Sequence, residues 1–470
     1  MFAIIPFGIP ILGSFLTLIA DRFSRILRNA LAALIVLATF AACLALIPTA
    51  NQSRTIMVGP SSLPGLSFNF VIDGLGVFIA IMSSLIGLLI VFYSMGYMSE
   101  YKYQGEYYFL VVLFLGAMVG LALSANLLLI YIFWEITAIC SWRLIGFYRH
   151  PQHLRNADTA LMMTVFGSFL MLVGLEMVWH ETGSLNLNMV HGHTISNLAL
   201  FFIYMGLLAK SAQVPLQVWL PGAGVAPSPV TALLHAATLV VIGVFAFARM
   251  FVGVFHLSVD WQIATSAVAV ITILVAGGAA LMENNAKRIL AYSTLGQLGY
   301  AILGLASMNP IGITGGLIYL LAHSLAKAGL FLCVGIIEHK THTRDLRELG
   351  GLLRTMPITG VTFILCMLTI IGFPPTAGFF GKLMIFMGSM QSGKTLLVIG
   401  AVLGAILTVI YMLRMFNAVF LGAERWKGTK EGTPGMLAIV ILFAALSLLV
   451  GFAIQPLANL VTLITSQLIG

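Results

Sequence analysis

Five ionisable side chains lie within long apolar stretches of the sequence: Glu135, Lys210, His235, Lys327 and Lys382. A charge at the centre of a lipid bilayer costs about 2.5 to 3.5 kcal/mol on insertion scales, so an ionisable residue there indicates function by default. Carboxylates, amines and imidazoles can each take up and release a proton, and chains of them form proton relays in pumps. The alternative for Glu135 is a structural ion pair with a lysine, which would fix how two helices pack.

Two of the lysines stand beside prolines that interrupt the apolar stretches. Lys210 precedes Pro215 by five residues, and Lys382 follows the pair Pro374 and Pro375. A proline removes a backbone donor and opens the helical hydrogen-bond ladder. Discontinuous membrane helices line ion sites in transporters built from inverted repeats. Because the two lysines flank their breaks in opposite chain order, the spacing predicts two inverted repeats; simple proline kinks are the alternative.

Histidines extend this set of candidates. His323 and Lys327 are four residues apart, so they share one face of a helix. Histidine titrates near neutrality, so it is suited to passing protons beside an amine. His235 follows Thr231 by one helical turn and is placed to bridge the two halves of a path. The alternative for either histidine is a packed side chain without a role in transfer.

The composition requires these residues to be held by membrane helices. The chain has 470 residues, of which 60% are hydrophobic and 8% charged, whereas soluble domains usually carry about 25% charged residues. The apolar stretches are long and continuous, unlike the alternating segments of outer-membrane barrels. The sequence therefore predicts an all-α polytopic membrane protein.

Other functional classes are disfavoured by the same composition. The net charge of +8 comes from basic residues spread between apolar stretches, so a nucleic-acid partner is not implied. The four cysteines lack metal-ligand spacing, and no phosphate loop, nucleophile elbow or redox motif is present. We expect no catalytic residue, metal or cofactor in this chain. The apolar start at Met1 is interpreted as the first span rather than a removable signal.

Hydropathy predicts fourteen spans, and the charges orient them. Sixteen Lys and Arg residues fall in one set of alternate loops and three, Arg54, Arg249 and Lys394, in the other. The basic set marks the cytoplasmic side, so both termini are expected outside, in a prokaryotic inner (cytoplasmic) membrane. The predicted spans lie near residues 3–20, 27–47, 74–97, 107–123, 125–147, 159–179, 197–221, 229–252, 262–281, 289–307, 312–337, 357–390, 395–421 and 436–455.

Several of these stretches resemble one known family. They are FWEITAICSWRLIGFY, AKSAQVPLQVWLPGAGVAPSPVTALLHAATLV, AKRILAYSTLGQLGYAILG, AHSLAKAGLFL and GFPPTAGFFGK, all within about residues 70–420. The sequence is similar to the antiporter-like membrane subunits of respiratory complex I, Mrp-type cation/proton antiporters and energy-converting hydrogenases. Tyr319 stands one turn before His323, where the complex I subunit farthest from the redox arm often has a second histidine.

The resemblance implies fourteen core helices, with discontinuous helices 7 and 12. It divides the single membrane domain, 1–470, into N-terminal helices 1–3 (1–106), a first five-helix repeat (107–252), an inverted second repeat (262–421), and helix 14 with the C-terminal tail (436–470). The role of residues 456–470 is left open.

By the same match, the proton path contains six residues: Glu135 and Lys210 as a charged pair, His235 as the connection, His323 and Lys327 as the centre, and Lys382 as the end. Pro215, Pro374 and Pro375 mark the helix breaks.

The expected function is proton translocation in a redox-driven complex, either a complex I-like NADH/quinone oxidoreductase or a membrane-bound hydrogenase or formate hydrogenlyase. Its partners would be other membrane subunits, including antiporter-like neighbours, lipid and, indirectly, a peripheral redox arm with Fe–S, flavin or NiFe subunits. One alternative is a subunit of an Mrp-type Na+/H+ antiporter. The other is a membrane anchor for a soluble inorganic-carbon or redox partner.

Overall fold

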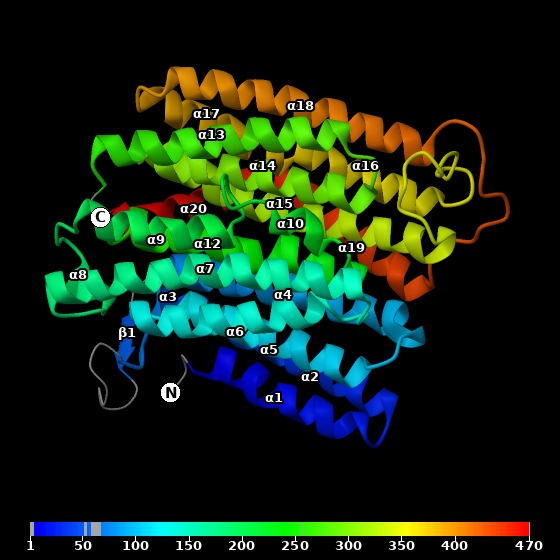
Figure 1. Cartoon of the computed structure of the whole chain (residues 1–470), viewed down its shortest axis with the longest axis horizontal. Coiled ribbons are helices and arrows are strands. Elements are labelled where there is room, and N and C mark those ends of the chain that lie inside the picture. Colours follow the sequence, from blue (N-terminus) through cyan, green and yellow to red (C-terminus); the bar gives the residue numbers. More distant parts are fainter. Residues whose placement is uncertain (1–3, 51–53, 58–66, 256, 470) are drawn as a thin grey trace.

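The computed structural model describes residues 4–50, 54–57, 67–255 and 257–469, which form one elongated helical bundle (Figure 1). The elements run in chain order as α1 (Ile5–Asp21), α2 (Arg25–Leu44), α3 (Ile47–Ala50), β1 (Arg54–Met57), β2 (Asn69–Ile72), α4 (Gly74–Tyr97), η1 (Met98–Glu100), α5 (Gln104–Leu123), α6 (Leu127–Ile145), α7 (Pro151–Thr182), α8 (Leu187–Val190), α9 (Asn197–Lys210), α10 (Trp219–Ala223), α11 (Ser228–Ala232), η2 (Leu233–Ala237), α12 (Leu239–Ala246), η3 (Phe247–Val252), α13 (Val259–Met282), α14 (Ala286–Ala306), α15 (Pro310–Thr341), α16 (Pro357–Ile371), α17 (Ala377–Gln391), α18 (Thr395–Phe420), α19 (Pro434–Phe452) and α20 (Ile454–Ile469).

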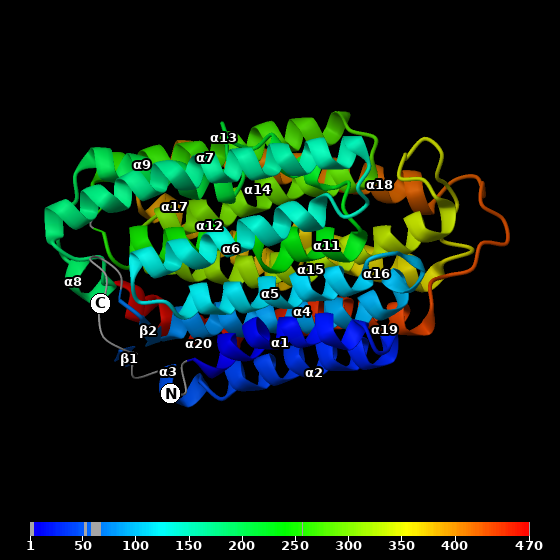
Figure 2. The ribbon, with the colours of Figure 1, turned by 60° about the horizontal axis from the view of Figure 1, so that its bottom comes forward.

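Eleven helical segments of the described chain are long and apolar enough to cross a membrane. Four shorter apolar helices, α1, α9, α16 and α20, accompany them. The long helices run side by side along the bundle in both views (Figures 1 and 2). Within the described residues the strands form one small antiparallel pair, β1 with β2. The prediction of an all-α polytopic membrane protein is confirmed.

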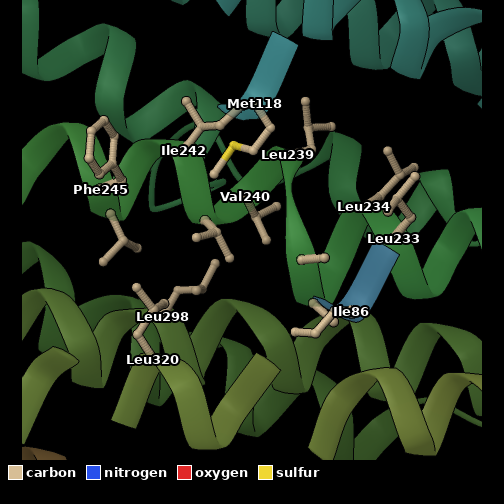
Figure 3. Close-up of a cluster of buried hydrophobic side chains, with 14 of the residues drawn as sticks. Ile86, Met118, Leu233, Leu234, Leu239, Val240, Ile242, Phe245, Leu298 and Leu320 are labelled. Carbon is tan, nitrogen blue, oxygen red and sulfur yellow. The ribbon is translucent and has the colours of Figure 1, made fainter. Parts of the chain in front are cut away.

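The centre of the bundle is formed by α14, α15 and the segment from α11 to η3. Every residue from Ser228 to Val252 is buried, and nearly all of α14 and α15 is buried as well. Figure 3 shows Met118, Ile242, Leu298 and Leu320 among the side chains of this core. Since lipid is as apolar as leucine, close packing rather than hydrophobic burial holds such helices together in a membrane.

Two apolar stretches are interrupted where prolines occur. Helix α9 ends at Lys210 and α10 begins at Trp219, with Pro215 in the non-helical residues between them. Helix α16 ends at Ile371 and α17 begins at Ala377, and Pro374 and Pro375 lie between them. The backbone groups at these inner helix ends lack helical partners, so they are available to other groups.

A further irregularity appears in the buried segment from α11 to η3. Two stretches, η2 and η3, have the wider π-helical hydrogen-bond pattern. His235 lies in η2 and Arg249 in η3. Such π-bulges occur frequently at functional sites, and nothing in the sequence pattern predicted them.

A short backbone frame fixes the start of α6 to the chain after α7. The Asn126 side chain caps α6 by accepting from two backbone N–H groups. Beside this cap, the Leu127 N–H donates to the Leu185 carbonyl at 2.8 Å, and the Leu187 N–H donates to the Ala125 carbonyl at 3.0 Å. These paired bonds hold both ends of the α6–α7 hairpin together.

The same frame recurs between α14 and the chain after α15. Asn285 caps α14, the Ala286 N–H donates to the Arg344 carbonyl at 2.9 Å, and the Leu346 N–H donates to the Asn284 carbonyl at 2.9 Å. Helix α8, which follows the first frame, lies at the left end of the bundle in Figure 1. The yellow loop after α15, in the second frame, lies at the right end. The two frames therefore close opposite ends of the bundle.

The close contact between α15 and α17 predicts that a larger side chain at their interface disrupts the packing of the two helices. A side chain at Gly388 would overlap the backbone nitrogen of Gly312, which cannot move aside as a side chain can. We expect Gly388→Val to separate the helices and destabilise the protein by about 1 to 3 kcal/mol or more. Gly278→Val is the matched control, because nothing lies within 4 Å of that position. Thermal unfolding of the detergent-purified protein measures both; equal midpoints would contradict the packing described.

Candidate functional site

Lys210 is the last residue of α9 and is fully buried. Its ammonium nitrogen donates to the Trp134 carbonyl of α6 at 3.0 Å and lies 5.1 Å from the centre of the Trp134 ring. The hydroxyl of Thr137 donates to the same carbonyl at 2.6 Å. The lysine is thus held by a backbone dipole and an aromatic face, which accept from an amine without carrying a full charge.

Glu135 follows Trp134 directly and is half-buried. Its carboxylate lies within electrostatic range of Lys210, yet among the described residues no ion pair joins the two. Its buried Oε1 atom has no hydrogen bond in the described chain. The two groups predicted to form a charged pair therefore interact electrostatically, without an ion pair or a hydrogen bond between them.

His235 and His323 lie at the centre of the bundle, and both are buried. The His235 ring packs on Phe331 of α15, with 4.7 Å between ring centres. None of the four ring nitrogens has a hydrogen-bond partner of good geometry in the described residues, although the His323 ring lies near the backbone of His235. Buried polar atoms in proteins normally have partners, so these unsatisfied nitrogens single out the two histidines as candidates for proton transfer.

Lys327 is held in the same manner as Lys210. It lies on α15, is fully buried, and donates to the Leu290 carbonyl of α14 at 2.9 Å. The hydroxyl of Thr294 donates to that carbonyl at 3.0 Å. His323 lies one turn earlier on α15, and Lys327 acts electrostatically on both histidines. The structure therefore brings the three predicted central residues together.

Lys382 lies on α17, just beyond the second break. Its nitrogen donates to the carbonyls of Ile370 at 2.8 Å and Ile371 at 3.3 Å, which are the last two residues of α16. The C-terminal carbonyls of a helix carry partial negative charge, so they favour a cation. The rings of Tyr300 and Tyr319 lie 4.7 Å and 5.4 Å from the same nitrogen.

A buried chain of uncharged polar groups, which the sequence analysis missed, lies between the last two lysines. The Tyr319 hydroxyl donates to the Gln297 side-chain oxygen, and the Gln297 amide donates to the Tyr411 hydroxyl at 3.2 Å. Tyr411 donates to Ser293 at 2.8 Å, and Ser293 precedes Thr294, which shares the carbonyl bound by Lys327. The polar run in YSTLGQLGY, within an apolar helix, is the sequence signal for this chain.

Two charges that the sequence placed in loops are in fact buried. Lys287 is 1% exposed in α14 and forms an ion pair with Glu338 at 2.7 Å. Arg249 is buried in η3 and pairs with Asp73, with one of its bonds at 2.9 Å. These assignments were wrong because each residue lies within a few turns of a helix end, where hydropathy alone does not distinguish a buried charge from a loop residue. Asp73 also caps α4.

A sequence model of the family described as "NADH:quinone oxidoreductase/Mrp antiporter, TM" matches residues 124–408, more than half of the chain. The chain belongs to this family. A model described as "NADH-Ubiquinone oxidoreductase (complex I), chain 5 N-terminus" also matches residues 63–108 of this antiporter-family chain. The resemblance drawn from the motif stretches is confirmed.

Relatives of known identity extend this finding. The Na(+)/H(+) antiporter subunit A1 of Staphylococcus saprophyticus is 33% identical over 461 residues, covering 88% of this chain and 57% of the relative. The antiporter-family chain therefore spans little more than half the length of that relative. Its fold is similar to a chain in the structure of the Mrp complex from Dietzia sp. DQ12-45-1b, with a TM-score of 0.91, 23% identity, and coverage of 99% and 97%. It is also similar to a chain of respiratory complex I from Thermus thermophilus, with a TM-score of 0.85, 24% identity, and complete coverage of both chains.

The contrast between unpaired lysines and paired charges predicts different effects on stability. Lys382 forms no ion pair with the described residues, so Lys382→Met removes a buried charge and leaves none behind. We expect its unfolding midpoint in detergent to equal or exceed that of the parent. Arg249→Met leaves Asp73 unpaired and should cost about 3 to 5 kcal/mol. A large loss of stability in Lys382→Met, matching that of Arg249→Met, would show that the lysine is structural.

Proposed function

We propose that this chain is a proton-translocating, antiporter-like subunit of a multisubunit membrane complex. One observation supports the proposal above the others. Lys210, Lys327 and Lys382 are buried, form no ion pairs with the described residues, and each donates to a backbone carbonyl of a neighbouring helical segment. A carbonyl accepts a hydrogen bond from a neutral amine as well as from an ammonium, so these lysines can lose and regain protons in place.

We further propose fourteen spans in two inverted repeats. The count follows when α9 with α10, and α16 with α17, are each taken as one interrupted span, α11 to η3 as another, and the 16-residue α20 is not counted as a span. The matching Asn126 and Asn285 frames support the repeats. Each residue of the second frame lies at the same sequence offset from its counterpart in the first, and the two frames close opposite ends of the bundle. The same offset relates Pro215 to Pro374. The repeats are 107–252 and 262–421, within a single domain whose termini lie outside.

The proposed path runs sideways through the bundle. It starts at Glu135 and Lys210, continues through His235 to His323 and Lys327, and ends at Lys382. Between the last two lysines, Tyr319 and Tyr411 supply hydroxyl groups that can pass a proton, and the Gln297 amide orients both of them by hydrogen bonds. A membrane potential of 100 mV opposes each proton by about 2.3 kcal/mol, which corresponds to a change of one or two pKa units along such a path.

The identity of the driving complex is a separate question. The 33% identity with an Na(+)/H(+) antiporter subunit A1 favours an Mrp-type antiporter assembly. A redox-driven complex is the second candidate, because the matched family joins NADH:quinone oxidoreductases with Mrp antiporters. In either assembly the partners are other membrane subunits and lipid. Purifying the complex through a tag on this chain, and identifying the accompanying subunits, separates the two assemblies.

Loss of a buried lysine should stop translocation without stopping assembly. In the purified complex reconstituted into vesicles, we expect Lys327→Ala and Lys382→Ala each to reduce proton uptake by about tenfold or more, equivalent to ~1.4 kcal/mol in the barrier. Partner subunits should still co-purify. Lys427→Ala, at an exposed loop residue, is the control. Parental rates in both variants would refute the proposal and favour the membrane-anchor alternative.

The polar chain gives a finer test. Tyr319→Phe keeps the ring beside Lys382 and removes the hydroxyl that donates to Gln297. We expect uptake to fall severalfold to about tenfold, as expected when one proton-carrying group is removed. Tyr204→Phe serves as the control, since that buried hydroxyl has no hydrogen bond in the described chain. Equal rates in the two variants would exclude the Tyr319 hydroxyl from the path.

A further inference from the structure

A second group of buried charges lies outside this path, at the end of the bundle where the basic loops gather. Glu338 of α15 is 14% exposed, and its carboxylate accepts from Lys287 of α14 at 2.7 Å and from Arg344 at 2.5 Å. The hydroxyl of Ser228, the first residue of α11, donates to the same carboxylate at 3.1 Å. Donors from α14, from α11 and from the loop after α15 thus surround one acid, and two of these donors are cations.

The same helices carry this cluster and the centre of the path. Glu338 and Lys327 are both on α15, eleven residues or about three turns apart, so they lie on one face. On α14, Lys287 precedes by one turn the carbonyl of Leu290 that holds Lys327. Ser228 begins the buried segment that continues to His235. A change at the cluster therefore acts on the elements that position the central groups.

The cluster also reaches towards the loops. Arg344 is 24% exposed and donates to the Gly224 carbonyl at 3.4 Å. On the opposite side, the Tyr97 hydroxyl donates to Ser228 at 3.4 Å, and the Tyr97 ring stacks on Tyr101 towards the loop after α4. Polar groups therefore extend from the partly exposed loops to the buried carboxylate.

Lys287 has two acceptors. Besides Glu338, its nitrogen donates to the Ala226 carbonyl at 3.0 Å, just before α11. While both cations contact Glu338, the carboxylate is held ionised. If Lys287 shifts to Ala226 alone, the carboxylate loses one counter-charge and can accept a proton. The ammonium keeps a hydrogen-bond partner in either position.

We propose that Glu338 is the proton-loading group for Lys327 at this end of the bundle, and that Lys287 gates it. This inference rests on the proposed function. A proton from the aqueous side binds the Glu338 carboxylate to give the carboxylic acid. It then moves along the buried segment that begins at Ser228 and contains His235, and it reaches the neutral amine of Lys327, forming the ammonium and restoring the carboxylate. No electrons are transferred.

The main competing explanation is that the cluster only pins α11, α14 and α15 together. Two variants distinguish the explanations in the reconstituted complex. Glu338→Gln removes the acid but leaves Lys287 with a buried, uncompensated charge. The double variant Lys287→Met with Glu338→Gln removes the acid and its fully buried cation, and leaves Arg344, which is 24% exposed and can be hydrated. It should therefore assemble as the parent does even if the single variant does not. Glu100→Gln is the control, because Glu100 is an acid at the same end that is 75% exposed.

We expect the double variant to co-purify with its partners at parental yield and to take up protons about tenfold more slowly or worse, with Glu100→Gln unchanged. Parental uptake in the double variant would overturn the loading role and leave the cluster a structural one. Lys327→Ala, measured in parallel, separates the two proposals. If Lys327→Ala abolishes uptake while the double variant does not, the loading inference alone fails. If Lys327→Ala leaves uptake unchanged, the proposed function fails first.

Discussion

The arrangement depends on how a cation is kept inside a membrane without a permanent counter-charge. Lys210, Lys327 and Lys382 are each bonded to a backbone carbonyl rather than to a carboxylate. A buried ion pair would hold each amine protonated, because separating the pair leaves a buried charge. A carbonyl dipole is weaker and accepts from the charged or the neutral amine. In the proposed function, the lysines therefore stay in place while their charge changes.

The rest of the fold makes such carbonyls available in the right positions. The break between α16 and α17 frees the helix-end carbonyls that bind Lys382. In α6 and α14, by contrast, the lysine shares a carbonyl with a threonine hydroxyl. Glycine contacts such as Gly388 on Gly312 bring α15 and α17 together closely enough for Lys382 and Tyr319 to meet. Paired charges such as Arg249 with Asp73 lie outside the path and stabilise the ends of the helices.

The sequence predicted the residues that stand out from the apolar segments around them, namely the buried lysines and the proline breaks. Buried lysines are rare within membrane spans, and a proline beside one is rarer than a proline kink alone, so Lys210, Lys327, Lys382 and Pro215 could be identified by type and spacing. Uncharged groups such as Gln297 could not, because polar amides and hydroxyls are common at helix–helix contacts and their partners lie on other helices.

Three-dimensional detail was beyond the sequence for similar reasons. The π-helical geometry at His235 depends on tertiary packing, and no residue pattern marks it. Lys287 lies just after the cap residue of α14, where the sequence pattern is that of a loop cation. Its burial beside Glu338 is apparent only in the structure. The choice of the Trp134 carbonyl as the partner of Lys210, in place of the Glu135 carboxylate, depends on side-chain positions that spacing along two helices does not determine.

The most direct test of the central claim is to keep the charge at the centre and remove its ability to dissociate. Arginine donates to a carbonyl as lysine does, but its guanidinium does not lose a proton in proteins. Proton uptake by the reconstituted complex carrying Lys327→Arg, with assembly verified by co-purification, provides the measurement. The account predicts that uptake is lost although the positive charge is retained. Uptake at the parental rate would show that Lys327 acts as a fixed charge and not as a carrier of protons.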